Sequence, residues 1–239
     1  MAEILSPQPK LGVLGGMGPQ ATIGFYQFIV DRTQASCDQD HLPTLILSDS
    51  QIPDRTAAIL SGNTEPAFQH LLKDARLLED SGCTTIVIPC NTAHYFVDRL
   101  QQELKVPIIH MVRETVGRLA RAGKKRPCIL GTDGTIQTGL YQKECAAVGL
   151  DALSPPADIQ KLVMSIIYDE IKAGKRGSWD KFQQIDDTLS AMGCDCAILA
   201  CTELSVFRAQ YGLPPYYVDA MEVLAEEAVV RCGKTLKKI

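Results

Sequence analysis

Short apolar runs alternate with longer amphipathic segments along nearly the whole chain. The runs are rich in Val, Ile and Leu, and the segments between them carry apolar residues at helical spacing. This alternation predicts β-α-β units and therefore an α/β fold built on parallel sheets. We expect strands over residues 11–14, 44–47, 84–88, 107–109, 127–130, 196–200 and 215–218.

Helix-start signals stand between these runs. Pro19 suits a first helical position, Thr64 and Pro66 precede a helix over 68–80, and Ser178 is a cap for a helix over 179–192.

The composition excludes several classes of protein. A chain of 239 residues with 46% hydrophobic and 22% charged residues is ordinary for a globular protein with a real core. The formal net charge of −4 and the absence of a basic stripe argue against nucleic acid as a partner. The apolar runs are too short for a membrane span, and the first residues lack the pattern of an export signal. We therefore expect a soluble, cytoplasmic protein.

The nine cysteines have irregular spacings and form no C-x-x-C pair, so the sequence supports neither a disulfide framework nor a metal site. Free thiols in a reducing cytoplasm fit best.

The chain repeats itself weakly. Residues 14–18 resemble 130–134, and 107–114 resemble 215–222, in the same order in both halves. A duplicated α/β unit predicts two pseudo-symmetric lobes, each a parallel sheet flanked by helices, with an active site in the cleft between them. We expect the first lobe to comprise residues 1–107 plus 215–239 and the second to comprise 108–214.

Two cysteines occupy matching places in this repeat. Cys90 and Cys201 each follow an apolar run and precede polar residues with a threonine, so each lies where a buried strand ends and a helix begins. The carboxyl ends of parallel strands form binding sites, and a helix N-terminus favours a thiolate. Two thiols facing each other across a cleft could move a proton from one face of a carbon to the other. The alternative is that both are buried and merely pack, as free cysteines usually do.

Other motifs admit further interpretations. Residues 16–21 fit the dinucleotide fingerprint G-x-G-x-x-A, although Pro19 removes an amide that would face a pyrophosphate. His94 lies four residues after Cys90 and could form a Cys-His dyad, but packing or support of the site fits the sequence better because no orienting residue is evident. Arg55, after the second strand, could bind a carboxylate with two hydrogen bonds or be solvated in a loop. Lys161 could be plain helix surface.

Four motifs together resemble one family. Residues 15–19, 51–56, 89–94 and 200–204 are similar to those of aspartate racemases, a branch of the cofactor-independent aspartate/glutamate racemase superfamily. The resemblance spans almost the whole chain. It implies racemisation of aspartate without a cofactor or metal, by Cys90 and Cys201 as the two acid/base groups, and commonly a homodimer.

The resemblance also implies roles for substrate-binding residues. The α-carboxylate and ammonium groups would be surrounded by Asn91, Thr92, Thr132, Thr202 and Glu203. The side-chain carboxylate would be bound by Arg55 and Lys161. The pocket would also be lined by Met17 and Gln51. It further suggests that Cys201 takes the proton from the L-enantiomer and Cys90 from the D-enantiomer.

One departure separates the chain from glutamate racemases. Their second motif resembles Cys-Thr-His, whereas Glu203 follows Thr202 here. This favours aspartate, while related substrates such as glutamate, hydantoins, maleate or arylmalonates remain alternatives. An NAD-dependent oxidoreductase using the glycine turn and a non-catalytic dicarboxylate binder are more distant ones.

Overall fold

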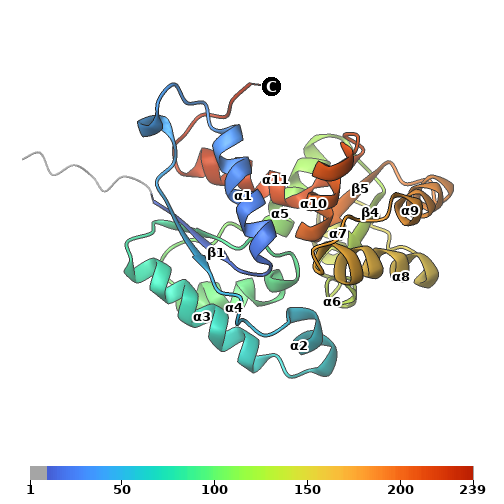
Figure 1. Cartoon of the computed structure of the whole chain (residues 1–239), viewed down its shortest axis with the longest axis horizontal. Coiled ribbons are helices and arrows are strands. Elements are labelled where there is room, and N and C mark those ends of the chain that lie inside the picture. Colours follow the sequence, from blue (N-terminus) through green and yellow to red (C-terminus); the bar gives the residue numbers. More distant parts are fainter. Residues whose placement is uncertain (1–9, 239) are drawn as a thin grey trace, which may run out of the picture.

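The computed structural model describes residues 10–238 and shows an α/β fold with two three-stranded parallel sheets, each flanked by helices (Figure 1). The strand order is β2-β1-β3 in the first sheet and β4-β5-β6 in the second. The strands are β1 (Leu11–Gly15), β2 (Thr44–Ser48), β3 (Thr85–Val87), β4 (Pro127–Gly131), β5 (Cys196–Ala200) and β6 (Tyr217–Asp219).

Helices fill the connections between the strands. The α-helices are α1 (Pro19–Arg32), α2 (Arg55–Ser61), α3 (Glu65–Asp80), α4 (Val97–Glu103), α5 (Met111–Arg121), α6 (Asp133–Gln137), α7 (Leu140–Ala147), α8 (Ala157–Ser165), α9 (Trp179–Ala191), α10 (Thr202–Tyr211) and α11 (Ala220–Arg231). Short 3-10 turns cover Asp38–Asp40 and Thr92–Phe96, and a π-helical turn, Ile166–Ile171, continues α8. Two predicted helix starts are confirmed, because Pro19 is the first residue of α1 and the side chain of Ser178 caps α9.

The two sheets share one topology. Ile108 forms a parallel bridge to Ile86 at one side of the first sheet, and Leu153 forms a parallel bridge to Cys128 at one side of the second. Each half of the chain therefore contributes four paired segments, and their order across the sheet, numbered along the sequence, is 2-1-3-4 in both lobes. By this order β1 is equivalent to β4, and β3 is equivalent to β5. The predicted pair of pseudo-symmetric α/β lobes is confirmed.

The 107–109 segment departs from the prediction. It forms a bridge but no strand, because contact is limited to Ile86, which donates to the carbonyl of Pro107 and accepts from the amide of Ile109. Proline has no N–H to extend the ladder.

The apolar core has three parts. One lies on the outer side of the first sheet under α3 and α4, and a second lies on the outer side of the second sheet under α8, α9 and α10. The third is shared by both lobes, because α11 packs against α1 and α5 in the middle of the molecule (Figure 1). This shared core fixes the carboxyl ends of both sheets relative to each other.

The division into residues 1–107 plus 215–239 and 108–214 remains a proposal. The strand pairing modifies it at both boundaries. Residues 217–219 form β6, which pairs with β5 in the second sheet, whereas Ile108 pairs with the first.

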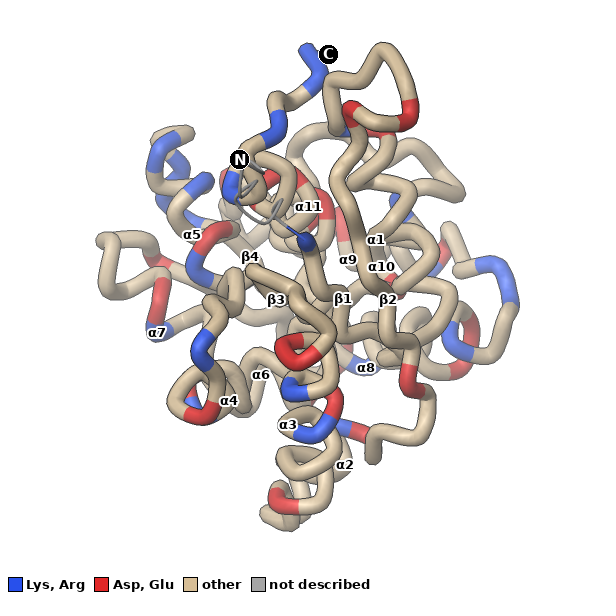
Figure 2. Tube along the Cα trace, turned by 90° about the vertical axis from the view of Figure 1, so that its left-hand side faces the viewer, with Lys and Arg blue, Asp and Glu red and all other residues tan. Residues whose placement is uncertain are grey.

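Three features of residues 10–238 bear on the expectations about membranes, disulfides and surface charge. Among residues 10–238, no helix has both the length and the apolar character needed to cross a membrane. The nine cysteines, all within this range, are free. Basic and acidic residues are mixed along the chain in the view of Figure 2 and do not form a basic stripe there. The N-terminal segment in which we expect no export signal falls outside the described residues.

Candidate active site

A small pocket forms where the strand ends of both lobes converge. Met17 follows β1, Arg55 follows β2, Cys90 follows β3, Thr132 follows β4 and Cys201 follows β5, and all five line it. The remaining lining residues are Asp54, Thr56, Asn91, Thr92, Tyr168, Lys172, Thr202 and Glu203. The free volume among these side chains is about 10 Å³, about the room of one water molecule. Side chains therefore fill most of the site in this conformation.

A glycine makes the turn after β1 possible. Gly16 has a φ of +90°, and a Cβ there would lie 2.2 Å from the carbonyl oxygen of Asp49. Only glycine allows this turn to approach the chain after β2 and to carry Met17 into the pocket.

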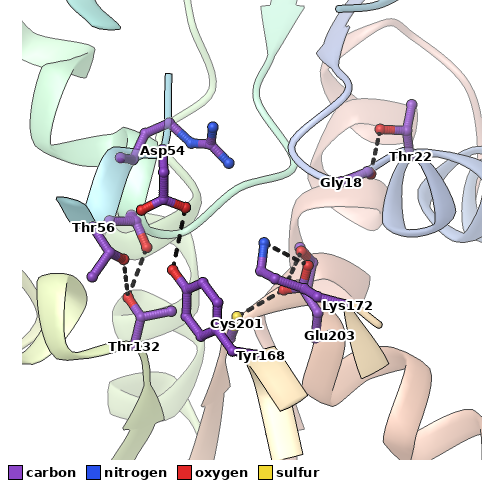
Figure 3. A network of polar contacts seen from close by, with 12 residues as sticks. Gly18, Thr22, Asp54, Thr56, Thr132, Tyr168, Lys172, Cys201 and Glu203 are labelled. Carbon is purple, nitrogen blue, oxygen red and sulfur yellow. Dashed lines mark hydrogen bonds and ion pairs between the residues drawn. The ribbon is translucent and has the colours of Figure 1, made fainter. Parts of the chain in front are cut away.

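Cys201 belongs to a chain of three polar groups (Figure 3). Its thiol donates to Glu203 Oε2 over 2.9 Å, and Glu203 Oε1 lies 3.1 Å from Lys172 Nζ. Burial raises the pKa of Cys201 well above its ordinary value and the Glu203 carboxylate raises it further, whereas Lys172 acts in the opposite direction. Cys201 is therefore held as the thiol.

Lys172 supplies the ammonium group among the pocket-lining residues. Its side chain is 25% exposed, and burial opposes its charge, but Glu203 and the two cysteines outweigh this, so that the pKa of Lys172 lies above its usual range. A permanent positive charge thus lies near both Cys90 and Cys201, where it stabilises a thiolate.

Cys90 is positioned through the backbone. Its carbonyl oxygen lies 2.9 Å from His94 Nδ1, and His94 Nε2 lies 3.0 Å from the amide of Met111. Because the amide can only donate, Nε2 is the acceptor and Nδ1 carries the proton. Both ring nitrogens are occupied, and burial, with the neighbouring His110, lowers the pKa of His94 to about 3. His94 supports Cys90 and is not placed to act as its base.

A cluster of hydroxyl groups joins the lobes beneath the pocket. Thr132 Oγ1 accepts from Thr56 at 3.1 Å and lies 3.0 Å from Thr92 Oγ1. The approach is close, since a Cβ at Gly134 would lie 3.0 Å from Cα of Thr56.

Two buried donors at the pocket have no partner among residues 10–238. Tyr141 donates to Asn91 Oδ1, which leaves Asn91 Nδ2 free, and Arg55 Nε is likewise unpaired. Arg55 is only 8% exposed and is held by Nη1 bonds to the carbonyls of Ile52 and Pro53. Buried donors without partners are costly, so both atoms suit an anionic ligand.

Tyr168 and Asp54 close the pocket from opposite lobes. The Tyr168 hydroxyl donates to Asp54 Oδ2 over 3.3 Å, as Figure 3 shows. Burial raises the pKa of Tyr168 to about 12, so it remains the donor at neutral pH.

The structure brings together nine of the eleven residues selected from the sequence and leaves two outside. Gln51 is exposed and does not line the pocket. Lys161 is exposed on α8 beside a separate surface hollow, so its predicted place at the site is wrong. Lys161 lies about 16 Å before Lys172 along the continuous helical segment, because eleven residues rise about 1.5 Å each.

Sequence reasoning missed four lining residues: Asp54, Thr56, Tyr168 and Lys172. Asp54 and Thr56 are the two sequence neighbours of Arg55, so their position beside a selected residue was an available signal. Tyr168 and Lys172 come from the π-helical turn and the residue after it, and π-turns often mark functional positions.

Comparisons with known proteins identify the family to which this fold belongs. A family model described as Asp/Glu/Hydantoin racemase matches residues 14–228. The chain is 29% identical over 226 residues to the broad specificity amino-acid racemase RacX of Bacillus subtilis, covering 92% of this chain and 96% of that protein. An aspartate racemase structure from Picrophilus torridus aligns with a TM-score of 0.80 and 29% identity over 96% of both chains. A glutamate racemase structure from Francisella tularensis, in complex with D-glutamate, shares the fold, with a TM-score of 0.65, 17% identity, and coverage of 94% of this chain and 81% of that one.

Proposed function

Since this chain belongs to the Asp/Glu/hydantoin racemase family and is therefore a PLP-independent isomerase, we propose that it interconverts L- and D-aspartate with Cys90 and Cys201 as the two acid/base groups. The observation that carries this proposal is that two cysteines from equivalent strand ends line one small pocket. Two opposed acid/base groups invert a carbon without an electron sink.

In the proposed reaction, one thiolate removes the α-proton and the C–H electron pair moves into the α-carboxylate as an enolate-like state. The opposite thiol then gives its proton to the other face of the same carbon. One proton leaves and one arrives, so no oxidant or reductant is needed. The cysteines exchange roles in the reverse direction.

The hydrogen bond to Glu203 decides which cysteine begins in which role. Because Cys201 is held as the thiol, we assign it the proton-donor role in the first turnover and assign Cys90 the role of base. With the family-based pairing of Cys90 and the D-enantiomer, D-aspartate is the substrate that meets the resting form.

The developing negative charge requires donors that are already in place. Asn91 Nδ2 has no partner among residues 10–238, and the amide of Thr202, the first residue of α10, has no acceptor within that helix. Both donors can therefore bind the α-carboxylate. Loss of one such donor commonly lowers a rate by about 10²–10³.

Arg55 and Lys172 are the two cationic side chains that line the pocket, one from each lobe. We propose that they bind the side-chain carboxylate, so Lys172 takes the role predicted for Lys161. The similarity to an aspartate racemase supports aspartate as the substrate. The NAD alternative rested on the glycine turn at residues 16–21. This turn lies within residues 14–228, which the racemase family model matches, so the racemase proposal accounts for it.

A cytoplasmic location and a homodimer also remain proposals. Ile23 and Tyr26 on α1, 65% and 40% exposed, are apolar side chains that a second copy could cover. Light scattering after gel filtration would measure the oligomeric state.

The deciding experiment follows the α-proton of L-aspartate by NMR in D₂O with purified, reduced protein and no added PLP. Loss of that signal, with D-aspartate appearing on chiral chromatography, is the expected result, and glutamate should react more slowly. A folded sample that produces no D-aspartate, or that requires PLP, would reject the proposal.

A further inference from the structure

The side chain of Asn91 has two ends of opposite hydrogen-bonding character. It directly follows Cys90, lines the pocket and is 3% exposed. Its carbonyl oxygen accepts hydrogen bonds and its amide nitrogen donates them, and a half-turn of the amide plane exchanges the two. A substrate carboxylate can only accept, so the amide end would bind it and the oxygen end would repel it. The proposed reaction therefore needs one orientation of Asn91 to be fixed.

Tyr141 on α7 contacts the oxygen end. Its hydroxyl donates to Asn91 Oδ1 over 2.5 Å, and its ring is fully buried in the apolar core shared by both lobes. Burial raises the pKa of Tyr141 above its usual range, so the hydroxyl keeps its proton and remains a donor. A half-turn of Asn91 would take Oδ1 away from this buried donor, which costs free energy. The other end, Nδ2, is thereby left without a partner among residues 10–238.

This contact joins the two lobes. Asn91 follows β3 of the first sheet, whereas α7 belongs to the second lobe. Thr92, the next residue, is held in a similar way, because its Oγ1 lies 3.0 Å from Oγ1 of Thr135 on α6. Like Tyr141, Thr135 is buried and does not line the pocket. Two side chains of the second lobe thus support the two residues that follow Cys90.

We propose that Tyr141 is a positioning residue, whose hydroxyl holds Asn91 Oδ1 so that Nδ2 is presented to the α-carboxylate of the substrate. This inference rests on the proposed racemase function. As the α-proton leaves, the C–H electron pair moves into the carboxylate and its oxygens become more negative. A donor fixed in place is therefore worth more in the transition state than in the bound substrate. Tyr141 acts through Asn91, and mainly on kcat.

A double-mutant cycle tests this coupling by α-proton exchange of L-aspartate in D₂O. Tyr141→Phe removes the hydroxyl and keeps the ring in the core, and Asn91→Ala removes the amide. We expect Tyr141→Phe to lower kcat about tenfold to a hundredfold with KM within about threefold, since loss of one such donor commonly costs about 10²–10³. In an Asn91→Ala background the same substitution should change kcat less than about twofold, because the group through which it acts is missing.

A matched control removes another buried tyrosine hydroxyl. Tyr217 on β6 is 3% exposed, and its hydroxyl donates to Asp186 outside the pocket. Tyr217→Phe should therefore keep the kinetics of wild type, which separates the loss of a buried hydrogen bond from the loss of the bond to Asn91.

A second measurement uses wild type and so does not depend on whether Tyr141→Phe folds. The chain contains two asparagines, Asn91 and the exposed Asn63. Protein labelled with ¹⁵N in the asparagine side chains therefore gives one pair of amide signals for each, and Asn91→Ala assigns them. Saturating aspartate should move the Asn91 pair downfield, because Nδ2 gains an acceptor, and should leave the Asn63 pair unchanged.

Three results would overturn the inference and leave the proposed function standing. They are wild-type kcat in folded Tyr141→Phe, an equal effect of Tyr141→Phe with and without the Asn91 amide, and an Asn91 signal that does not respond to aspartate. Absence of exchange in folded wild type would reject the proposed function and the inference with it.

Discussion

The thiol of Cys201 donates its hydrogen bond to the carboxylate of Glu203, two residues further on, across 2.9 Å. Glu203 in turn holds Lys172 at 3.1 Å. One carboxylate thus keeps a proton on the thiol and a cation beside both cysteines, which makes the two sides of the pocket chemically unequal although the lobes are pseudo-symmetric.

Replacing Glu203 tests this asymmetry. In Glu203→Gln the thiol loses a negatively charged acceptor and keeps the neighbouring Lys172, so the pKa of Cys201 should fall. Alkylation of Cys201 by iodoacetamide, followed by peptide mass spectrometry across pH 6–10, should shift to lower pH. Glu170→Gln, which breaks the ion pair with Lys181 instead, is the control and should leave the profile unchanged. An unchanged profile in Glu203→Gln would contradict the role given to the carboxylate.

The two cysteines should be separable by enantiomer. Cys90→Ser and Cys201→Ser should each abolish racemisation, because a serine hydroxyl is far too weakly acidic to replace the thiol pair. Each variant should retain deuterium exchange with one enantiomer at most, since one thiol still faces the α-carbon. NMR of L- and D-aspartate in D₂O checks this with Cys83→Ser, a buried cysteine outside the pocket, as control. Full racemisation by either variant would reject the two-base mechanism.

The two lysines predict opposite results. Lys172→Met should lower kcat/KM for aspartate about 30-fold or more, which corresponds to about 2 kcal/mol for a lost charged partner. Lys161→Met should stay within twofold, because Lys161 lies outside the pocket. Steady-state kinetics of both variants decides the matter, and equal losses would place Lys161 back at the site.

Arg55 should not tolerate lysine. Arg55→Lys keeps the charge but loses the planar group whose Nη1 binds two backbone carbonyls and whose buried Nε has no partner among residues 10–238. We expect KM for aspartate to rise at least tenfold, with circular dichroism close to wild type. Wild-type kinetics would show that Arg55 only anchors the chain before α2.

The buried histidines predict a loss of stability in acid. A histidine in the unfolded chain binds a proton near pH 6.5, whereas burial lowers the pKa of His94 to about 3 and that of His110 to about 4. The unfolded state therefore binds more protons in this interval, and the free energy of unfolding falls as the pH drops from about 6.5 to about 4.

Each histidine contributes at most about 1.4 kcal/mol per pH unit to this fall. His110→Asn keeps an acceptor for the amide of Arg113 and removes one titrating group. Urea unfolding at several pH values should show a shallower slope than wild type, and identical slopes would contradict the interpretation.

Much of the site was predictable because local pattern and position along the strands coincide. Cys90 and Cys201 were identified since each follows a buried apolar run, and in a parallel sheet that place is at the binding edge. Arg55 lies beyond the loop that follows β2, and Thr132 directly follows β4, although only the family resemblance pointed to Thr132. Their presence in one pocket required only that both sheets expose the same edge to the cleft.

Lys172 could not be found by that reasoning. Lys161 and Lys172 are eleven residues apart, about three turns of an ideal helix, so a helical pattern places them on the same face. Only the π-helical turn Ile166–Ile171 and the packing of this segment beside α10 determine which of them reaches Glu203.

The alternation of strands and helices, the duplication and the two cysteines at strand ends could all be predicted from the sequence. These features depend on apolar periodicity and on residues close in the chain. The tertiary structure alone decided that β6 pairs with β5 and that one apolar core is common to both lobes. It also decided that Glu203 meets the thiol of Cys201 and that Lys172 closes the pocket. These contacts depend on side-chain orientation and on elements brought together by burial, neither of which a pattern along one chain specifies.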